Sequence, residues 1–165
     1  MYYNLPNPYI EPYFYPYLGP TYPYMYDPGL EKALNLIRKA VAGEASDRKF
    51  YDYLISVAPN EKEKQIIASI RDDEIKHYKM FRQIYKEITG QYPVPLGEEE
   101  FVKPNNYLDG IEQALFGELA AVEMYRQIYF GLRSREHRDM LFEIITDELK
   151  HSAKYNFLYT RNYRK

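Results

Sequence analysis

The hydrophobic and polar positions of the chain divide it near residue 28. Beyond that point apolar residues such as Leu30 and Ile37 recur at the spacing of an amphipathic helix. Asp27 and Pro28 favour a helix start, because aspartate accepts hydrogen bonds from free backbone N–H groups and proline suits the first helical position. Pro59 cannot continue a helix without losing a backbone hydrogen bond. We therefore expect one helix between these two prolines.

The same pattern predicts three more helices. Asn60 and Glu63 have the spacing of a capping box, and Gly90 suits the left-handed conformation that ends many helices. A third helix is expected from about residue 105 to about residue 131, and Ser134 caps a fourth that runs to about residue 160. Four long amphipathic helices with two short connections predict an all-α four-helix bundle.

The linker between the second and third helices sets the topology of this bundle. It has about fourteen residues and contains Pro93, Pro95, Gly97 and Pro104. When extended it reaches roughly 46 Å, and a helix of thirty residues is about 45 Å long. The linker can therefore cross the full length of the bundle, which makes the second and third helices parallel.

Residues 1–27 differ from the rest in composition. They contain nine tyrosines and six prolines, with Glu11 and Asp27 as their only charged residues. Proline fixes φ and removes a backbone donor, so we expect an extended arm rather than a helix. Many aromatic rings gain by lying on a surface, which favours an arm that packs on its own bundle or on a neighbour. A disordered tail is the alternative. The expected domains are thus this arm and a bundle over residues 28–165.

Composition excludes several classes of function. The chain has 165 residues and a net charge of −2, with acidic and basic residues interleaved. We therefore expect neither a nucleic-acid partner nor a membrane partner. No cysteine is present, which excludes disulfides, zinc–thiolate sites and thiol catalysis. The first basic residue is Lys32, so the N-terminus lacks the charged region of a secretory signal. We therefore expect a cytoplasmic location.

One pentapeptide occurs twice. Residues 73–77 read DEIKH and residues 147–151 read DELKH, and these copies hold two of the three histidines. Aligning residues 43–85 with residues 117–159 gives nine identities in 43 positions. Each half is then one helical hairpin with a glutamate on its first helix and Glu-x-x-His on its second.

The spacing places the four glutamates of the repeat at one height. Glu44 lies fifteen residues before Pro59 and Glu74 lies fifteen residues after it, so folding at the proline brings them level. Glu118 and Glu148 have the same relation in the second half. All four continue the apolar stripes of their helices and therefore face the core.

Unpaired carboxylates in a core cost several kcal/mol each, and metal cations remove that cost. Glutamate and histidine three residues apart project from one helix face, so one helix can supply both. A single Glu-x-x-His is more often a solvated surface feature, but two inward-facing copies favour a metal site. The sequence predicts a two-metal site with the ligands Glu44, Glu74, His77, Glu118, Glu148 and His151.

Two aspartates precede the predicted ligands. A metal-bound imidazole usually donates its other N–H to a carboxylate. The two-fold arrangement would let Asp147 accept from His77 and Asp73 accept from His151. The alternative is that both are ordinary surface acids.

Two tyrosines lie two helical turns after the first glutamate of each half. Tyr51 and Tyr125 are either core aromatics or donors of hydrogen bonds to the metal-binding carboxylates. The third histidine, His137, has charged neighbours in the first turn of the fourth helix. We expect it to be exposed.

Residues 28–160 resemble the ferritin-like superfamily, in particular its rubrerythrin branch. Residues 43–51, GEASDRKFY, are similar to the first-helix signature of rubrerythrins, in which Gly-Glu is followed by Arg and Tyr. The resemblance implies a di-iron centre, held by the six ligands above, that reduces hydrogen peroxide or oxidises ferrous iron. Ala121 stands where rubrerythrins carry an extra glutamate. The cysteine-free chain cannot hold a rubredoxin iron, which implies a separate electron donor or ferrous iron itself.

Two functions of different class follow from these features. The first is an oxidoreductase with two iron ions per chain, manganese being the alternative metal, and with peroxide or O₂ as substrate. The second is a structural assembly protein on the same scaffold, since the arm is similar in composition to coat proteins of bacterial endospores. That alternative would place the protein at the spore. A homodimer is expected in either case.

Overall fold

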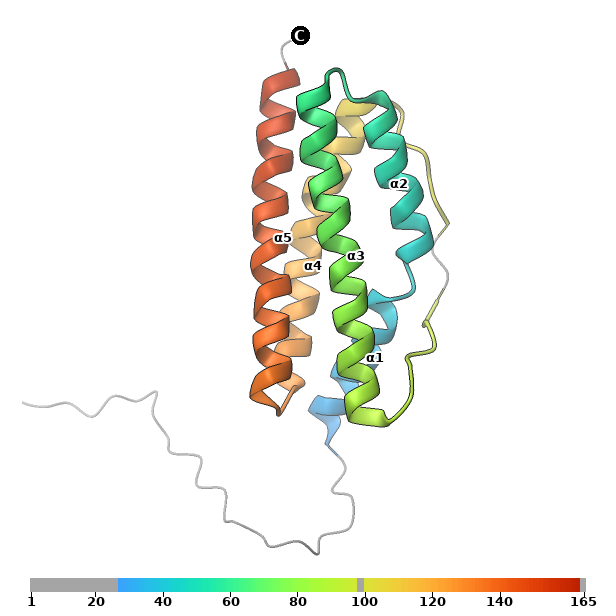
Figure 1. Ribbon diagram of the computed structural model, residues 1–165, viewed down its shortest axis with the longest axis vertical. Helices are drawn as coiled ribbons and strands as arrows, with labels where there is room; N and C mark the ends of the chain where they lie inside the picture. The colour runs from blue at the N-terminus through green and yellow to red at the C-terminus, as the bar shows by residue number, and fades with distance from the viewer. Residues whose placement is uncertain (1–26, 98–99, 164–165) are drawn as a thin grey trace, which may run out of the picture.

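The computed structural model describes residues 27–97 and 100–163, without the side chains of residues 44 and 45. Residues 1–26, which make up nearly all of the predicted arm, lie outside the described part. The described residues form helices and no strand (Figure 1), which confirms the all-α fold class. The helices are α1 (Pro28–Ala40), α2 (Glu44–Val57), α3 (Glu61–Thr89), α4 (Tyr107–Gly131) and α5 (Arg135–Asn162).

Side-chain caps start four of these helices at the predicted positions. Asp27 accepts from the N–H groups of the α1 start, and Asn60 accepts from Glu63 N at 3.1 Å. The Asn60 side-chain amide also donates to the Glu63 carboxylate at 2.8 Å, so the two side chains hold each other at the helix start. Asn106 and Ser134 cap α4 and α5 in the same way. At the other end of α3, Gly90 has φ of 77°, the left-handed region that glycine adopts at little cost.

The prediction of one helix from Pro28 to Pro59 is wrong, because the chain breaks after Ala40 and starts again at Glu44. The N–H of Ala42 bonds to Lys39 O, three residues back, which tightens and closes α1. Gly43 then begins α2 without a side-chain cap. Glycine costs about 0.8–1.0 kcal/mol more than alanine inside a helix, which favours a break at this point. Together α1 and α2 take the place of one helix of a four-helix bundle.

The chain connectivity is that of a ferritin-like bundle with one long crossover. From the end of α3 the linker runs back along the outside of the bundle, so that α3 and α4 are parallel (Figure 1). Arg38 holds the linker by two hydrogen bonds. Its Nε donates to Val94 O at 2.8 Å, and its carbonyl accepts from Leu96 N at 3.0 Å. At the other end of the linker, the Tyr53 hydroxyl donates a hydrogen bond to Pro104 O at 3.2 Å.

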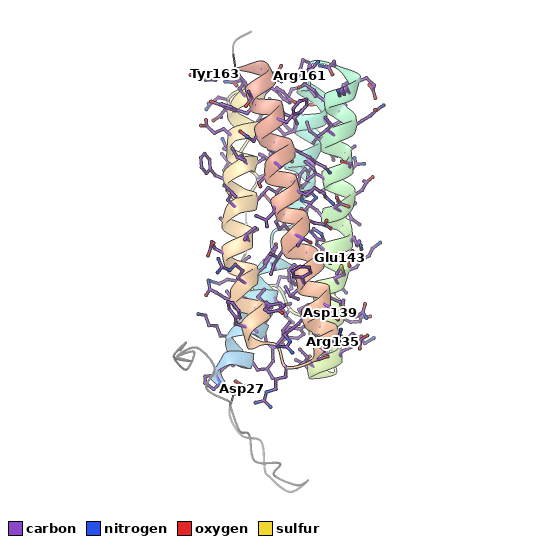
Figure 2. The ribbon with its side chains drawn as sticks, turned by 90° about the vertical axis from the view of Figure 1, so that its left-hand side faces the viewer. Asp27, Arg135, Asp139, Glu143, Arg161 and Tyr163 are labelled. Atoms are coloured by element: carbon purple, nitrogen blue, oxygen red, sulfur yellow. The ribbon has the colours of Figure 1, made fainter. Side chains whose placement is uncertain are left out.

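The start of α1 is packed against the turn between α4 and α5. A Cβ on Gly131 would lie 2.3 Å from Gly29 O, so this approach requires glycine. Arg133 also pairs with Asp27, with 2.7 Å between Nη2 and Oδ2. From there α5 runs from Arg135, at the end of the bundle where Asp27 lies, to Arg161 at the opposite end (Figure 2). No helix in the described part of the chain is both long and apolar enough to cross a membrane.

Two apolar clusters fill the bundle and leave its middle to polar side chains. The first cluster lies at the α1 end and contains Ala33, Ile37, Val41, Met80, Phe81, Ile84, Tyr125, Ile128, Leu132, Leu141 and Ile144. The second lies at the α2 end and contains Tyr51, Leu54, Ala58, Ile67, Ile70, Ile111, Ala114, Tyr155 and Leu158. The clusters exclude water from both sides of the polar layer between them.

Candidate metal centre

Three helices carry glutamate and histidine into the layer between the two apolar clusters. Their positions along each helix are where the apolar stripe is interrupted, so the fold that buries the stripes also buries these groups. Glu118 and Glu148 are buried, as are both histidines, and Glu74 is the most exposed member, with 23 % of its side chain accessible. The five residues are Glu74 and His77 on α3, Glu118 on α4, and Glu148 and His151 on α5.

The ionisable atoms of this cluster lie within contact of one another. Nδ1 of His151 lies 3.1 Å from Glu74 Oε1 and 3.6 Å from Glu148 Oε2. Nδ1 of His77 lies 3.2 Å from Glu148 Oε1 and 3.5 Å from Glu74 Oε2. One potential ligand atom from each of Glu74, Glu118, Glu148 and His151 falls within a group whose members are all within 4.8 Å of one another. The carboxylates of Glu74 and Glu148 therefore each face both histidines.

Four inward-facing atoms of the cluster are buried without a hydrogen-bond partner in the described structure: Glu74 Oε1, His77 Nδ1, Glu148 Oε1 and His151 Nδ1. Buried polar atoms are rarely left unpaired, because each costs its full desolvation energy. Oxygen and imidazole nitrogen are the donors that iron and manganese take in proteins. The residues present therefore fit a metal centre.

The buried carboxylates and imidazoles of the cluster shift one another's pKa. Burial alone would lower the pKa of both histidines, but the carboxylates of the surrounding glutamates, close to each Nδ1, outweigh it. The result raises the pKa of His77 to about 10 and that of His151 to about 12. Burial, and then the neighbouring Glu148, raise the pKa of Glu118 well above its usual range. Imidazolium protons thus supply the positive charge that the carboxylates require.

The outer nitrogens of both histidines contact aspartates across the α3–α5 interface. Nε2 of His77 lies 3.2 Å from Asp147 Oδ2, and Nε2 of His151 lies 3.0 Å from Asp73 Oδ2. This is the crossed pairing that the repeat predicts. Because Nε2–H donates to aspartate, Nδ1 is the nitrogen turned to the cluster and open to a metal.

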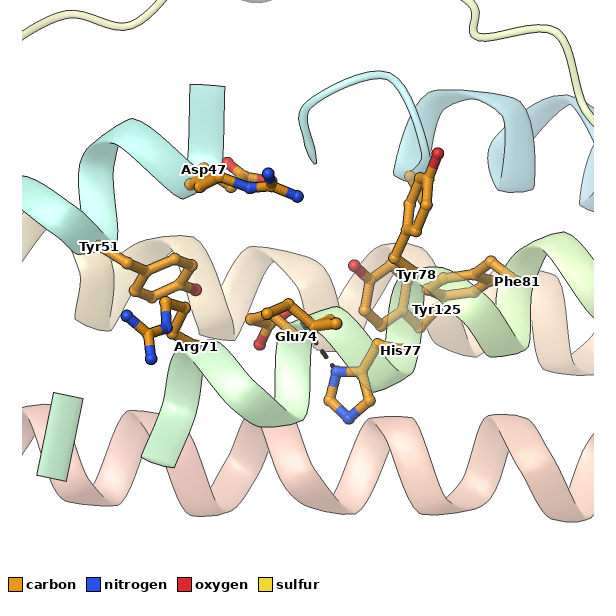
Figure 3. Close-up of a pocket in the computed structure, with 11 residues that line it drawn as sticks. Asp47, Tyr51, Arg71, Glu74, His77, Tyr78, Phe81 and Tyr125 are labelled. Atoms are coloured by element: carbon orange, nitrogen blue, oxygen red, sulfur yellow. Dashed lines mark ion pairs between the residues drawn. The ribbon is translucent and has the colours of Figure 1, made fainter. Parts of the chain in front are cut away.

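A small cavity reaches the cluster beside Glu74, between α2 and α3 (Figure 3). Its volume is about 60 Å³, which holds only molecules of about the size of water or slightly larger. The lining includes Asp47, Tyr51, Arg71, Glu74, His77, Tyr78, Phe81 and Tyr125. The cluster is thus open to small molecules on the side of its most exposed carboxylate.

Tyr51 and Tyr125 lie one in each apolar cluster, on opposite sides of the carboxylates. Burial raises the pKa of both phenols, and the charge of Glu74 and Glu118 raises it further. The described side chains include no hydrogen bond from either hydroxyl to a carboxylate. The alternative that their hydroxyls donate to the metal-binding carboxylates stays a prediction.

Sequence reasoning missed Tyr155. It is fully buried, and its hydroxyl has no partner among the described residues. It lies four residues after His151 on the same face of α5, and Phe81 occupies the equivalent position of the first half. The stripe formed by Glu148, His151 and Tyr155 was the signal that could have indicated it.

The prediction that His137 is exposed is wrong. Its side chain is buried, and Nε2 lies 2.8 Å from Glu87 Oε2 at the end of α3. The charged residues around it in sequence gave no sign of this contact, because Glu87 is fifty residues away along the chain.

The sixth predicted ligand, Glu44, is the first residue of α2, and its side chain lies outside the described residues. Ala121, in the same groove of α4 as Glu118, contributes no oxygen to the cluster. The described part of the centre thus has three carboxylates and two imidazoles.

The fold and the site together define a class of protein: a ferritin-like helical bundle with a carboxylate–histidine cluster at its middle. The sequence profile of the rubrerythrin family matches residues 35–159, and the chain belongs to that family. YhjR, an uncharacterized protein of Bacillus subtilis, is 31 % identical over 140 residues, which cover 85 % of this chain and 91 % of that protein.

A solved structure, a hypothetical protein from Pyrococcus furiosus, has a similar fold. It superposes with a TM-score of 0.69 at 22 % identity, over 78 % of this chain and 88 % of that one. At this identity the likeness extends to the fold alone.

Proposed function

We propose that this protein is a di-iron oxidoreductase that oxidises ferrous iron, with hydrogen peroxide or O₂ as the oxidant. The observation that carries the proposal is the set of unpaired oxygen and nitrogen atoms that converge between the two apolar clusters. Membership of the rubrerythrin family supports iron as the metal, with manganese as the alternative. The proposed ligands are the five residues described above, with Glu44 as the sixth.

The residues of the centre would divide the work in a simple way. Glu74 and Glu148 each lie close to Nδ1 of both histidines, so each would hold metal together with either histidine. Asp73 and Asp147 hold the histidine rings so that Nδ1 points inward. Two ferrous ions would supply the two electrons that cleave the O–O bond, giving two ferric ions and two waters from one peroxide and two protons.

Substrate size and electron supply follow from the surroundings. The cavity beside Glu74 is large enough for peroxide or O₂. With no cysteine in the chain, a separate protein or ferrous iron itself would supply electrons.

A second candidate function is a structural role in an assembly such as a spore coat. The observation that favours it is the composition of residues 1–27, whose nine tyrosines and six prolines supply no metal ligand. In that case the bundle serves as a scaffold and the metal only stabilises it.

Anaerobic loading with Fe(II), followed by peroxide, tests the first proposal. We expect two irons per chain by elemental analysis and one peroxide consumed for every two irons oxidised. Glu118→Ala should lose at least one iron per chain, because it removes the only described α4 ligand. Glu123→Ala is the matched control, since this α4 glutamate has 70 % of its side chain exposed and pairs with Arg126.

Full iron occupancy in Glu118→Ala would contradict the ligand assignment. A wild-type protein that holds two irons but consumes neither peroxide nor O₂ would contradict the oxidoreductase proposal and favour the scaffold.

A further inference from the structure

The lysine of the repeated pentapeptide is the one member of that motif that the metal site does not explain. Lys76 and Lys150 are equivalent in the two halves, seventy-four residues apart, and both lie on the outer side of the α3–α5 interface. Their side chains have similar exposure, 53 % for Lys76 and 49 % for Lys150. A two-fold arrangement would give them equivalent partners.

The structure gives the two lysines different partners. Lys76 pairs with Glu143, one turn before Asp147 on α5. Lys150 instead reaches both aspartates: its Nζ lies 2.6 Å from Asp147 Oδ1 and 3.4 Å from Asp73 Oδ2. Asp147 thus uses one oxygen for His77 and the other for Lys150.

These contacts form one continuous chain of polar groups outside the metal centre. It runs from His77 through Asp147 to Lys150, and from there through Asp73 to His151. A single ammonium group therefore sits between the two carboxylates that orient the two histidines.

We propose that Lys150 is a positioning residue that joins the two Asp–His pairs into one unit and sets the electron donation of both histidines together. This role deepens the proposed function and rests on it where a metal is concerned. The lysine touches neither the cluster nor a substrate, so it acts only through the aspartates.

The sign of the effect follows from charge. An aspartate that accepts from imidazole N–H raises the basicity of the ring as a ligand, and a cation on that aspartate reduces its pull on the proton. Removing the charge of Lys150 leaves both aspartates more basic, so both histidines donate more strongly. Stronger donors favour the ferric over the ferrous state, which lowers the reduction potential of the centre.

Other charged groups near the unit are arranged differently. Lys154 lies 4.0 Å from Asp73 Oδ2, beyond hydrogen-bond distance, and donates to Ser69 Oγ at 2.9 Å. Lys76 is neutralised by Glu143. Only Lys150, among the described cations, contacts both aspartates within 3.5 Å.

The first experiment needs no metal, so it separates this proposal from the proposed function. The chain has three histidines, and ¹⁵N-histidine NMR of the metal-free protein resolves their ring nitrogens. Lys150→Gln should shift the Nε2 signals of both His77 and His151, while His137, held by Glu87 at another site, stays unchanged as an internal reference. Lys76→Gln is the matched control and should move neither signal by a comparable amount.

The second experiment uses the iron-loaded protein in a redox titration. Lys150→Gln should keep the wild-type number of irons per chain and the wild-type melting temperature, but its midpoint potential should be lower. Lys150→Arg, which retains the charge, should restore most of the potential, and Lys76→Gln should leave it near the wild-type value.

The outcomes are distinct. If Lys150→Gln moves the NMR signals of only one histidine or of neither, the joined unit does not exist. If Lys150→Gln and Lys76→Gln lower the potential equally, the effect is that of general surface charge and the proposal fails. A wild-type protein without two irons would contradict the di-iron function, and the NMR comparison would still decide the role of Lys150.

Discussion

We expect His77 and His151 to carry different charges in the metal-free and metal-loaded protein. Without metal, the nearby glutamate carboxylates outweigh burial and raise the pKa of His77 to about 10 and of His151 to about 12. At neutral pH both rings then hold a second proton. A metal needs the neutral ring, so each ion that binds displaces protons and its affinity rises with pH.

The pH dependence of stability should therefore differ between the two forms. A histidine with a raised pKa stabilises the fold fully below its unfolded value of about 6.5 and loses that contribution as pH rises through the folded value. We expect the melting temperature of the metal-free protein to fall between pH 7 and pH 10. Metal should raise the melting temperature more at pH 8 than at pH 6. Each kcal/mol of added stability corresponds to a rise of about 2–4 °C. Calorimetry of both forms measures this, and a metal increment independent of pH would contradict it.

At the scale of elements, polar pairs tie both ends of α3 to α5. At one end Glu63 is buried and bonds Tyr107 and Asn162, each at 2.8 Å, and it pairs with Arg161 at 3.2 Å. At the other end His137 pairs with Glu87 at 2.8 Å. The two pairs occupy equivalent positions of the repeat, with acid and base exchanged. They fix the register of two antiparallel helices whose middle sections carry the metal ligands.

Glu63→Ala should destabilise the bundle, because Tyr107 and Asn162 lose a buried acceptor. Each unpaired group costs about 1–3 kcal/mol. Glu61→Ala is the matched control: it removes a neighbouring first-turn acid with 73 % exposure and should stay near wild type. Urea denaturation measures both, and equal effects would contradict the role of the network.

The same network predicts acid sensitivity. Burial would raise the pKa of Glu63, but hydrogen bonds from Tyr107, Asn60 and Asn162 lower it below 4.5 overall. Its contribution is therefore present above about pH 4.5 and is lost as pH falls through the folded value. Glu63→Gln should lose less stability on acidification than wild type.

At the scale of the whole molecule, we expect chemistry and assembly to use different parts of the chain. The proposed metal ligands that the structure describes all lie within the bundle, whereas several aromatic side chains are exposed on the outside of α4 and α5. Phe130 is 76 % exposed, Phe142 62 % and Phe116 61 %. Large exposed apolar groups favour association with another surface.

Deleting residues 1–26 should leave metal binding intact and change the oligomeric state. The deletion removes nine tyrosines and no predicted ligand. Asp27 remains and still caps α1. Sedimentation and iron analysis of the truncated and full-length proteins measure the two effects. A truncated protein that loses iron would show that the arm and the metal centre are not independent.

Local features of the sequence were enough to predict most of the fold. The caps at Asp27, Asn60 and Ser134 and the stop at Gly90 depend on residues within one helical turn, so a short window contains their cause. The break at Gly43 was missed, because the apolar stripe continues in phase across it. Propensity at one glycine is a weak signal beside a long periodic pattern.

The sequence by itself also determined the five side chains of the described polar layer, because the repeat places Glu118 and both Glu-x-x-His motifs on inward faces at the same height. What it could not determine were contacts between residues that are distant along the chain. The burial of His137 against Glu87, the unpaired hydroxyl of Tyr155 and the different partners of Lys76 and Lys150 depend on how α3 and α5 pack. The repeat makes the two halves equivalent in sequence, and only tertiary packing, where unlike side chains meet across the interface, makes them different.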